Sequence, residues 1–321
     1  MDRRIVTREG RVERGWLSFA GMDVELPYIE IDSGIPGPRL AVMSGIHPNE
    51  VSSMEAALRL VPALSDGLRC GTASLLPVVN MPGLAQHTEY VIPIDRQNLN
   101  FSFPGSPDGS FTERLAHALT TEWSAGAEVL VDLHGGDLRE DVAKFVMVQI
   151  TGQAAFDART RELARCYDAE LIVEFPPDET ANTGRATNAL PKLGRHAVMS
   201  EAGKNGRLDE ASIAFHLSGV LNISRLLGMT DGPKLPYGRA ARTLNGFDRI
   251  FAPEDGRFYC EVACNDAVSP GQRLAVLRDI FGTQIAEMRA PAAGRVVMII
   301  THNIVAKGEL VLSIGMTTDE R

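Results

Sequence analysis

Three side chains with the chemistry to bind one metal ion occur in two short motifs. His47 and Glu50 lie three residues apart in Gly-Ile-His-Pro-Asn-Glu, directly after an apolar run. At this spacing an imidazole and a carboxylate share one face of a first helical turn and can meet a single ion. His134 ends the apolar run 128–134, in Asp-Leu-His-Gly-Gly. Two histidines and one glutamate leave a fourth zinc position open, which is typical of a catalytic rather than a structural site.

These motifs need a scaffold that brings two strand ends together. The apolar runs 40–45 and 128–134 predict buried strands that end just before His47 and at His134. Further strands are predicted at 74–80, 144–150, 170–175 and 196–201, and helices at 49–64, 111–123 and 208–228. This alternation predicts an α/β fold, a sheet flanked by helices. In a parallel sheet the carboxyl ends of the strands share one edge, where ligands collect.

Length and charge limit the classes of function. The chain has 321 residues, 44% of them hydrophobic, which is enough for a large core. Its formal charge of -9, without a run of basic residues, argues against a nucleic-acid partner. The start of the chain is charged, and no stretch reaches the roughly 18 apolar residues of a membrane span. We therefore expect a cytoplasmic protein that does not bind membranes.

The character of the sequence changes near residue 236. Helical periodicity ends, glycines recur, and the segments 252–279 and 290–315 share Ala-Pro, Gly-Arg, valine, Gly and Leu in register. An internal duplication of short strands explains this pattern. Each copy resembles half of the barrel-sandwich fold of biotinyl and lipoyl carrier domains. The sequence predicts a catalytic domain over 1–235 and a small all-β, barrel-sandwich-like domain over 236–321.

The order of five motifs resembles that of a known hydrolase family. The motifs are Gly-Ile-His-Pro-Asn-Glu, Asn-x-Pro-Gly at 80–83, Asp-x-x-Asn-Leu-Asn-x-x-Phe-Pro-Gly at 95–105, Asp-Leu-His-Gly at 132–135 and Glu-Ala-Gly at 201–203. In these the chain resembles the bacterial deacylase branch of the succinylglutamate desuccinylase/aspartoacylase family. The resemblance implies a zinc carboxypeptidase-like fold. It implies one Zn²⁺ per chain, bound by His47, Glu50 and His134, and hydrolysis of an amide other than a peptide bond in a small N-acyl amino compound.

A hydrolase of this kind also needs a base that is not a metal ligand. Glu201 follows the predicted strand 196–201 and matches the family's catalytic glutamate; otherwise it is an ordinary loop acid. Asp132, two residues before His134, is expected to point to the other side of its strand and to have a supporting role.

The substrate-binding positions depart from the family pattern. Family members carry an arginine where this chain has Tyr90, by approximate alignment, and another directly after Asn-Leu-Asn, where it has Phe101. Phenylalanine cannot make the bidentate contact by which arginine binds a carboxylate. Arg96 and Arg185 are candidates for replacing the lost charge, unless they are solvated surface arginines.

Two asparagines of the same loop remain as polar candidates. Asn100 matches the family's substrate-binding asparagine, and Asn98 is a further candidate contact; the alternative for both is a purely structural role in the loop.

Two other functions remain open at this stage. A metallocarboxypeptidase would share the fold and the metal, but it needs a cation for the C-terminal carboxylate of a peptide, and Phe101 weakens this reading. The other alternative is a binding protein that kept the fold and lost catalysis. The intact metal ligands and Glu201 argue against it. The chain is also a candidate homo-oligomer.

Overall fold

Strands and helices alternate in the first two thirds of the chain. The structure, a computed structural model, describes residues 1–178, 183–233 and 241–317. The strands in this part are β1 (Asp2–Glu9), β2 (Val12–Ser18), β3 (Glu25–Asp32), β4 (Arg39–Ser44), β5 (Thr72–Leu76), β6 (Val129–His134), β7 (Glu140–Gln149), β8 (Leu171–Phe175) and β9 (His196–Lys204). The helices are α1 (Val51–Gly67), α2 (Met81–Gln86), α3 (Phe111–Ala118), α4 (Ala154–Ala164), α5 (Ala186–Lys192) and α6 (Glu210–Leu226), with the helical turns η1 (Leu99–Phe101) and η2 (Leu119–Trp123). Among these described helices, none is long and apolar enough to cross a membrane.

The described part of the last third consists of strands and connecting turns. The strands are β10 (Arg242–Phe251), β11 (Gly256–Cys260), β12 (Ala267–Val268), β13 (Arg273–Arg278), β14 (Gln284–Arg289), β15 (Gly294–Ile300), β16 (Ile304–Val305) and β17 (Leu310–Thr317). The predicted boundary between 235 and 236 lies outside the described residues. The division into two domains therefore stays a prediction.

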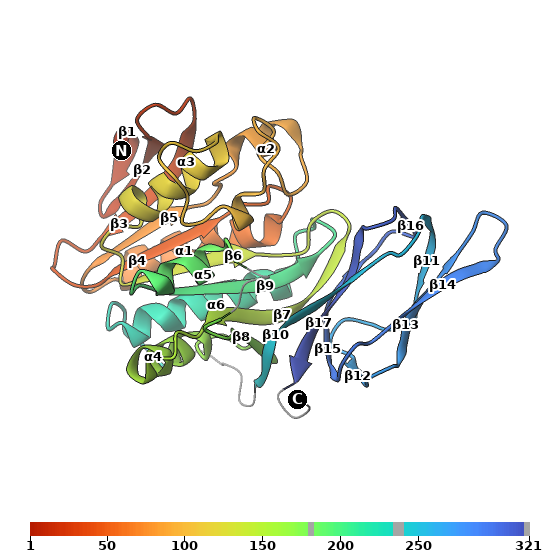
Figure 1. Ribbon diagram of the computed structural model, residues 1–321. Coiled ribbons are helices and arrows are strands. Elements are labelled where there is room, and N and C mark those ends of the chain that lie inside the picture. Colours follow the sequence, from red (N-terminus) through yellow and green to blue (C-terminus); the bar gives the residue numbers. More distant parts are fainter. Residues whose placement is uncertain (179–182, 234–240, 318–321) are drawn as a thin grey trace.

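One mixed sheet extends through both parts of the chain (Figure 1). Its order is β1-β2-β3-β5-β4-β6-β9-β7-β8-β10-β17-β15-β12, and β14-β13-β11-β16 form a second sheet. At its centre β5, β4, β6 and β9 are parallel neighbours, so the strands that carry the metal motifs and Glu201 end at one edge. The α/β class, with a mixed sheet flanked by helices, is confirmed.

The first three strands have no counterpart in the sequence predictions. β1, β2 and β3 extend the sheet in antiparallel fashion. All of β1 is exposed, so it lacks the apolar alternation that would reveal a strand. Ion pairs help to attach it: Arg3 contacts Glu30 at 2.6 Å and Arg4 contacts Glu25 at 2.7 Å. Exposed pairs of this kind are worth only about 0–1 kcal/mol each.

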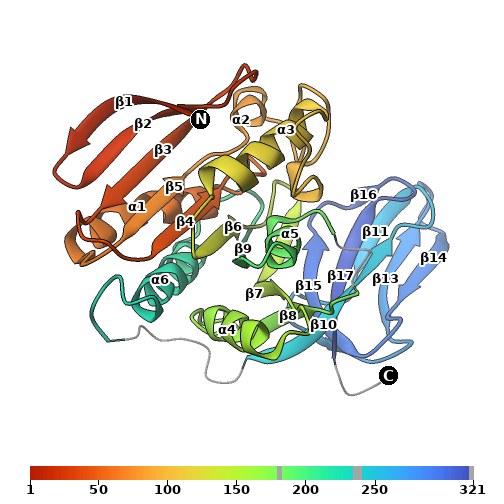
Figure 2. The ribbon, with the colours of Figure 1, turned by 60° about the vertical axis from the view of Figure 1, so that its left-hand side comes forward.

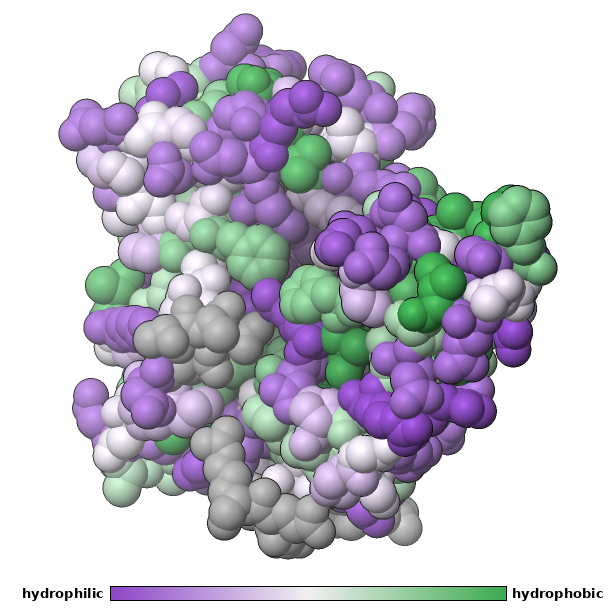
Figure 3. Space-filling view, turned by 45° about the vertical axis from the view of Figure 1, so that its right-hand side comes forward, coloured by the Kyte–Doolittle hydropathy of each residue, from purple (hydrophilic) through white to green (hydrophobic). Residues whose placement is uncertain are grey.

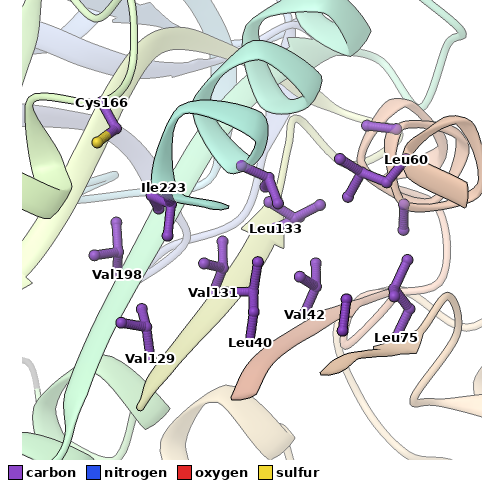
Figure 4. Close-up of a cluster of buried hydrophobic side chains, with 14 of the residues drawn as sticks. Leu40, Val42, Leu60, Leu75, Val129, Val131, Leu133, Cys166, Val198 and Ile223 are labelled. Carbon is purple, nitrogen blue, oxygen red and sulfur yellow. The ribbon is translucent and has the colours of Figure 1, made fainter. Parts of the chain in front are cut away.

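Helices cover both faces of the parallel strands (Figure 2). On one face, valines and leucines of β4, β6 and β9 pack against α1 and α6; Val42, Val131 and Val198 lie there with Leu60 and Ile223 (Figure 4). A second buried cluster fills the other face beneath α3, η2 and α5. The two cores fix the height and direction of β4, β6 and β9, and therefore of the side chains at their ends.

The two similar C-terminal segments have the same strand order. β11, β12 and β13 come from the first copy, and β15, β16 and β17 from the second. Each short strand pairs with the long strand of the other copy: β12 with β15, and β16 with β11. The C-terminal part is also joined to the larger sheet, because β10 pairs with β8 and β15 pairs with β7.

Helix α6 packs closely against the ring of Tyr167 at Gly219. An added Cβ would meet the buried ring of Tyr167 at 2.1 Å. In a helix interior alanine is favoured over glycine by about 1 kcal/mol, whereas overpacking of a core destabilises by about 1–3 kcal/mol. Gly219→Ala is therefore expected to lower the free energy of unfolding in urea. Ser218→Ala, at the neighbouring partly buried position, is the control; an increase in stability for Gly219→Ala would contradict the packing.

Candidate metal and catalytic site

Two imidazoles converge on one carboxylate at the edge of the sheet. His47 Nδ1 lies 2.6 Å from Glu50 Oε1, and His134 Nδ1 lies 3.0 Å from Glu50 Oε2. The three side chains are buried, and one ligand atom from each lies within 4.8 Å of the others. The structure thus brings together the three residues that the sequence singled out as ligands.

The outer nitrogens of both histidines face oxygen atoms. His47 Nε2 lies 3.2 Å from Asn98 Oδ1, and His134 Nε2 lies 3.2 Å from Asp132 Oδ1. The expectation that Asp132 points away from His134 is wrong, because residues two apart in a strand face the same side. An oxygen acceptor behind a ligating histidine fixes the orientation of its ring. Asp132 and Asn98 can therefore hold the two imidazoles with Nδ1 turned toward Glu50.

One of the two nitrogen–oxygen pairs, His134 Nδ1 and Glu50 Oε2, is better suited to binding a metal ion than to forming a hydrogen bond. Among the described residues, His134 Nδ1 and Glu50 Oε2 are buried without a hydrogen-bond partner, despite their proximity. Burial opposes ionisation of Glu50, but both imidazoles hold its pKa at about 2. Two neutral imidazole nitrogens and a carboxylate are the donor set of many catalytic zinc sites.

Loops anchored by other motif residues hold the ligands. Gly45 has φ of 65°, and a Cβ there would lie 3.0 Å from the Cα of Val78, so the turn before His47 requires glycine. Asn80 accepts a hydrogen bond from the N–H of Gly83 and donates to the carbonyl of Ile46. The Asn-x-Pro-Gly motif thus acts by tying the His47 turn to α2.

Glu201 lies beside His134, because these two residues are paired across β6 and β9. It lines a pocket of about 400 Å³ together with His47 and Glu50. Burial above all, and then the carboxylates of Glu50 and Glu140, raise the pKa of Glu201 well above its usual range. The glycines after His134 allow this proximity: a Cβ on Gly136 would lie 2.6 Å from the carbonyl oxygen of Gly203.

The two positions that depart from the family pattern both line this pocket. The ring of Tyr90 meets His47 edge-on, with 5.5 Å between ring centroids, and its hydroxyl interacts with the carboxylate of Glu140. The ring of Phe101 lies close to two cations: the guanidinium carbon of Arg185 is 5.2 Å from its centroid and that of Arg249 is 5.6 Å.

The other predicted substrate residues have different surroundings. Asn100 is buried, lines the pocket, and its Oδ1 has no hydrogen-bond partner among the described residues. The Oδ1 of Asn98 is already engaged by His47 and by the N–H of Asn100. Arg96 is exposed on the loop and is not among the residues that line the pocket.

One wall of the pocket was missed by the sequence analysis. It comes from β10, β15 and β17 and includes Phe247, Arg249 and Met298. Figure 3 shows a hollow in which hydrophobic and hydrophilic groups meet, between the larger body and the C-terminal strands. Glu140, at the start of β7, was also missed; burial, followed by Glu50, raises its pKa to about 7. No motif in the sequence marks these residues. Those of β10, β15 and β17 approach the metal ligands only through long-range strand pairing, whereas Glu140 follows the His134 loop directly.

Comparison with known proteins agrees with this geometry. The profile of the "Succinylglutamate desuccinylase/Aspartoacylase catalytic domain" matches residues 36–227. The chain belongs to the succinylglutamate desuccinylase/aspartoacylase family. It is therefore an amidohydrolase that removes acyl groups from N-acyl amino compounds, with a His-Glu-His metal site. The prediction of a deacylase is confirmed.

Individual relatives cover nearly the whole chain. An N-alpha-acetyl-L-2,4-diaminobutyric acid deacetylase of Halomonas elongata is 27% identical over 277 residues, which are 84% of this chain and 80% of the relative. The product-bound ectoine utilization protein EutE (DoeB) from Ruegeria pomeroyi has a TM-score of 0.85 at 25% identity, covering 98% of this chain and 99% of the other. A succinylglutamate desuccinylase from Silicibacter has a TM-score of 0.83 at 23% identity, covers 98% of both chains and supports the fold.

Asp132 provides a test of how the metal ligands are held. Asp132→Asn removes the charge that faces His134 Nε2 while preserving the shape of the side chain. We expect metal affinity to fall about 10–100-fold, as is usual when such a supporting carboxylate is lost. The measurement is metal retention against a competing chelator, with Asp66→Asn on the exposed side of α1 as the control. Unchanged affinity in Asp132→Asn would show that the ring of His134 is fixed by packing alone.

Proposed function

We propose that this protein is a zinc-dependent deacylase of small N-acyl amino acids. The observation that carries the proposal is the convergence of His47 Nδ1 and His134 Nδ1 on the two oxygens of Glu50, with Glu201 beside them in one pocket. His47, Glu50 and His134 hold one Zn²⁺ per chain, and a fourth position faces the pocket. Bound zinc supplies a Lewis acid that polarises the scissile carbonyl and acidifies water.

Glu201 performs the proton transfers of the reaction. Its carboxylate takes a proton from the attacking water and delivers a proton to the nitrogen of the leaving amine, so that a carboxylic acid and a free amine are formed. A raised pKa suits this exchange, because a base whose pKa approaches the working pH can both accept and return a proton. Glu201 lines the same pocket as the ligands His47 and Glu50, but it is not part of the cluster that His47, Glu50 and His134 form.

The cations around Phe101 provide a place for the substrate's carboxylate. Arg185 and Arg249 both lie over the ring of Phe101, and Arg185 is 7% exposed. By the family resemblance Phe101 takes the position of an arginine, and these two guanidiniums supply positive charge beside it. Asn100 adds a buried amide whose oxygen can accept a hydrogen bond from the amide N–H of the substrate.

The size and composition of the pocket favour a small molecule over a peptide. A cavity of about 400 Å³ lies near the lower end of the range for small-molecule sites, and strands of the C-terminal part form one of its walls. The amine released by the Halomonas relative, judged by its name, is an amino acid. These points support an N-acyl amino acid as the substrate class.

One set of assays tests both the hydrolysis of N-acyl amino acids and the role of Glu201 as the base. Zinc-loaded protein is assayed for amine release with N-acetyl, N-succinyl and N-formyl amino acids. Glu201→Gln should keep its metal and lose about 10²–10⁴-fold in kcat. Glu162→Gln, an exposed change on α4, should match the wild type in both respects. The proposal fails if no N-acyl compound is cleaved, and the role of Glu201 fails if Glu201→Gln remains fully active.

The proposed role of Arg249 in binding the substrate's carboxylate is tested by comparing substrates with and without that group. Removal of a charged hydrogen-bond partner costs about 1.5–3 kcal/mol, so Arg249→Gln should reduce kcat/KM for an N-acetyl amino acid about 10–100-fold. The matching N-acetyl amine, which lacks the carboxylate, should be affected less than about threefold by the same change. Arg96→Gln is the control, because Arg96 lies outside the pocket. An equal loss with both substrates, or a loss with Arg96→Gln, would assign the carboxylate to another residue.

A further inference from the structure

The catalytic carboxylate lies between a metal ligand and an apolar side chain in the central sheet. Glu201 of β9 is paired with His134 of β6 on one side and with Phe145 of β7 on the other. Directly paired residues point to the same face of a sheet, and in antiparallel strands their Cβ atoms lie about 4.5–5.5 Å apart. The groups that carry out hydrolysis therefore border directly on an apolar surface.

This surface belongs to the pocket and rests on a packed core. It consists of five pocket-lining side chains that we call the apolar wall: Phe145 and Met147 of β7, Val297 and Met298 of β15, and Phe247 of β10. The rings of Phe145 and Phe247 meet edge-on with 5.8 Å between centroids, and Phe175 supports Phe247 at 5.4 Å. Because these rings are packed on one another, the apolar wall has a defined shape.

The chemistry of the apolar wall limits what can lie against it. Its five side chains carry no charge, and none has an N–H or O–H group. An ammonium or carboxylate placed there would lose its water without gaining a partner. Each CH2 group that leaves water for such a surface instead favours binding about fourfold. The apolar wall is therefore suited to an aliphatic or aromatic group of the substrate.

Strand β10 indicates which part of the substrate meets the apolar wall. Phe247 and Arg249 both line the pocket and are two residues apart on this strand. Residues at this spacing point to the same side and lie roughly 7 Å apart. In an α-amino acid the carboxylate and the side chain leave the same carbon atom. A carboxylate at Arg249 therefore brings the side chain toward Phe247, whereas the acyl group lies across the scissile amide from both.

We propose that the apolar wall binds the side chain of the amino acid that is released, so that the substrates are N-acyl derivatives of apolar α-amino acids. This inference rests on the proposed function and names the substrate class of the same site. Phe145 brings the apolar wall next to Glu201, and Phe247 and Met298 determine which side chains bind. These residues select the substrate and take no part in the proton transfers.

Two isomeric substrates separate the side chain from the acyl group. N-acetylnorvaline and N-butanoylalanine each add two CH2 groups to N-acetylalanine, the first in the side chain and the second in the acyl chain. Zinc-loaded wild-type protein should use N-acetylnorvaline about 10–20-fold better than N-acetylalanine in kcat/KM, at about fourfold for each CH2 group. N-butanoylalanine should gain less than about threefold.

A third substrate tests the polarity of the group that meets the apolar wall. Nα-acetyl-2,4-diaminobutyrate carries an ammonium where N-acetylnorvaline carries its terminal methyl group. Its kcat/KM should be at least about tenfold lower than that of N-acetylnorvaline, because the ammonium would lose water at the apolar wall without gaining a partner.

A variant tests the apolar wall itself. Met298→Gln introduces an amide of similar length and should lower the preference for N-acetylnorvaline over N-acetylalanine to less than about threefold. Met316→Gln is the matched control, because Met316 is a partly buried residue of β17 that is not among the residues lining the pocket, and it should keep the full preference. Metal content and thermal midpoint show whether each variant is intact.

The possible outcomes separate this inference from the proposed function. The inference is overturned if N-butanoylalanine gains as much as N-acetylnorvaline, if the diaminobutyrate compound is used equally well, or if the preference survives in intact Met298→Gln. Each of these results leaves the deacylase proposal standing, because an N-acyl amino acid is still cleaved. If Met298→Gln is not intact, the wild-type comparison decides alone. Cleavage of no N-acyl amino acid at all overturns the proposed function itself.

Discussion

The architecture depends on bringing Glu50 between two imidazoles at the ends of adjacent strands. His47 follows β4 and His134 ends β6, and the two strands are parallel neighbours. Placing these groups in a buried site is unfavourable unless a cation or hydrogen bonds compensate their charge. The packed cores on both faces of the sheet, the glycines at the turns, and the oxygens behind each histidine all hold the site in place against that cost. A shift of one strand along the sheet would separate the ligands.

The sequence predicted what is encoded locally. His47 and Glu50 belong to one turn, His134 and Glu201 each end an apolar run, and the parallel pairing of their strands follows from the α/β pattern. Even here, the position of Asp132 was missed although the two-residue period of a strand would have given it. Arg249 was out of reach for a physical reason. Its place in the pocket depends on β10 joining a long sheet, and such long-range pairing leaves no pattern in the neighbouring sequence. Glu140 follows His134 closely in the chain, at the start of β7, but it belongs to none of the motifs.

Tyr90 and Phe101, the two positions that depart from the family pattern, both lie next to charged side chains in the pocket. Each is an aromatic ring where the family resemblance implies an arginine, and each ring lies in the pocket beside charged groups supplied by other elements. Phe101 offers its face to Arg185 and Arg249, a favourable arrangement for a cation next to an aromatic quadrupole. Tyr90 offers a hydroxyl to Glu140. Positive charge is thus concentrated around Phe101, and the surroundings of Tyr90 carry negative charge.

The positions of these charges in the pocket depend on the pairing of the C-terminal strands with the catalytic sheet. A deacylase needs its metal ligands and its base on rigid strands, but selectivity needs charges at fixed distances from them. β10 contributes Arg249 while pairing with β8, and β15 pairs with β7 directly opposite Glu140, where Ile300 is its partner. The same strand pairings therefore close the pocket and fix the positions of Arg249 and Glu140.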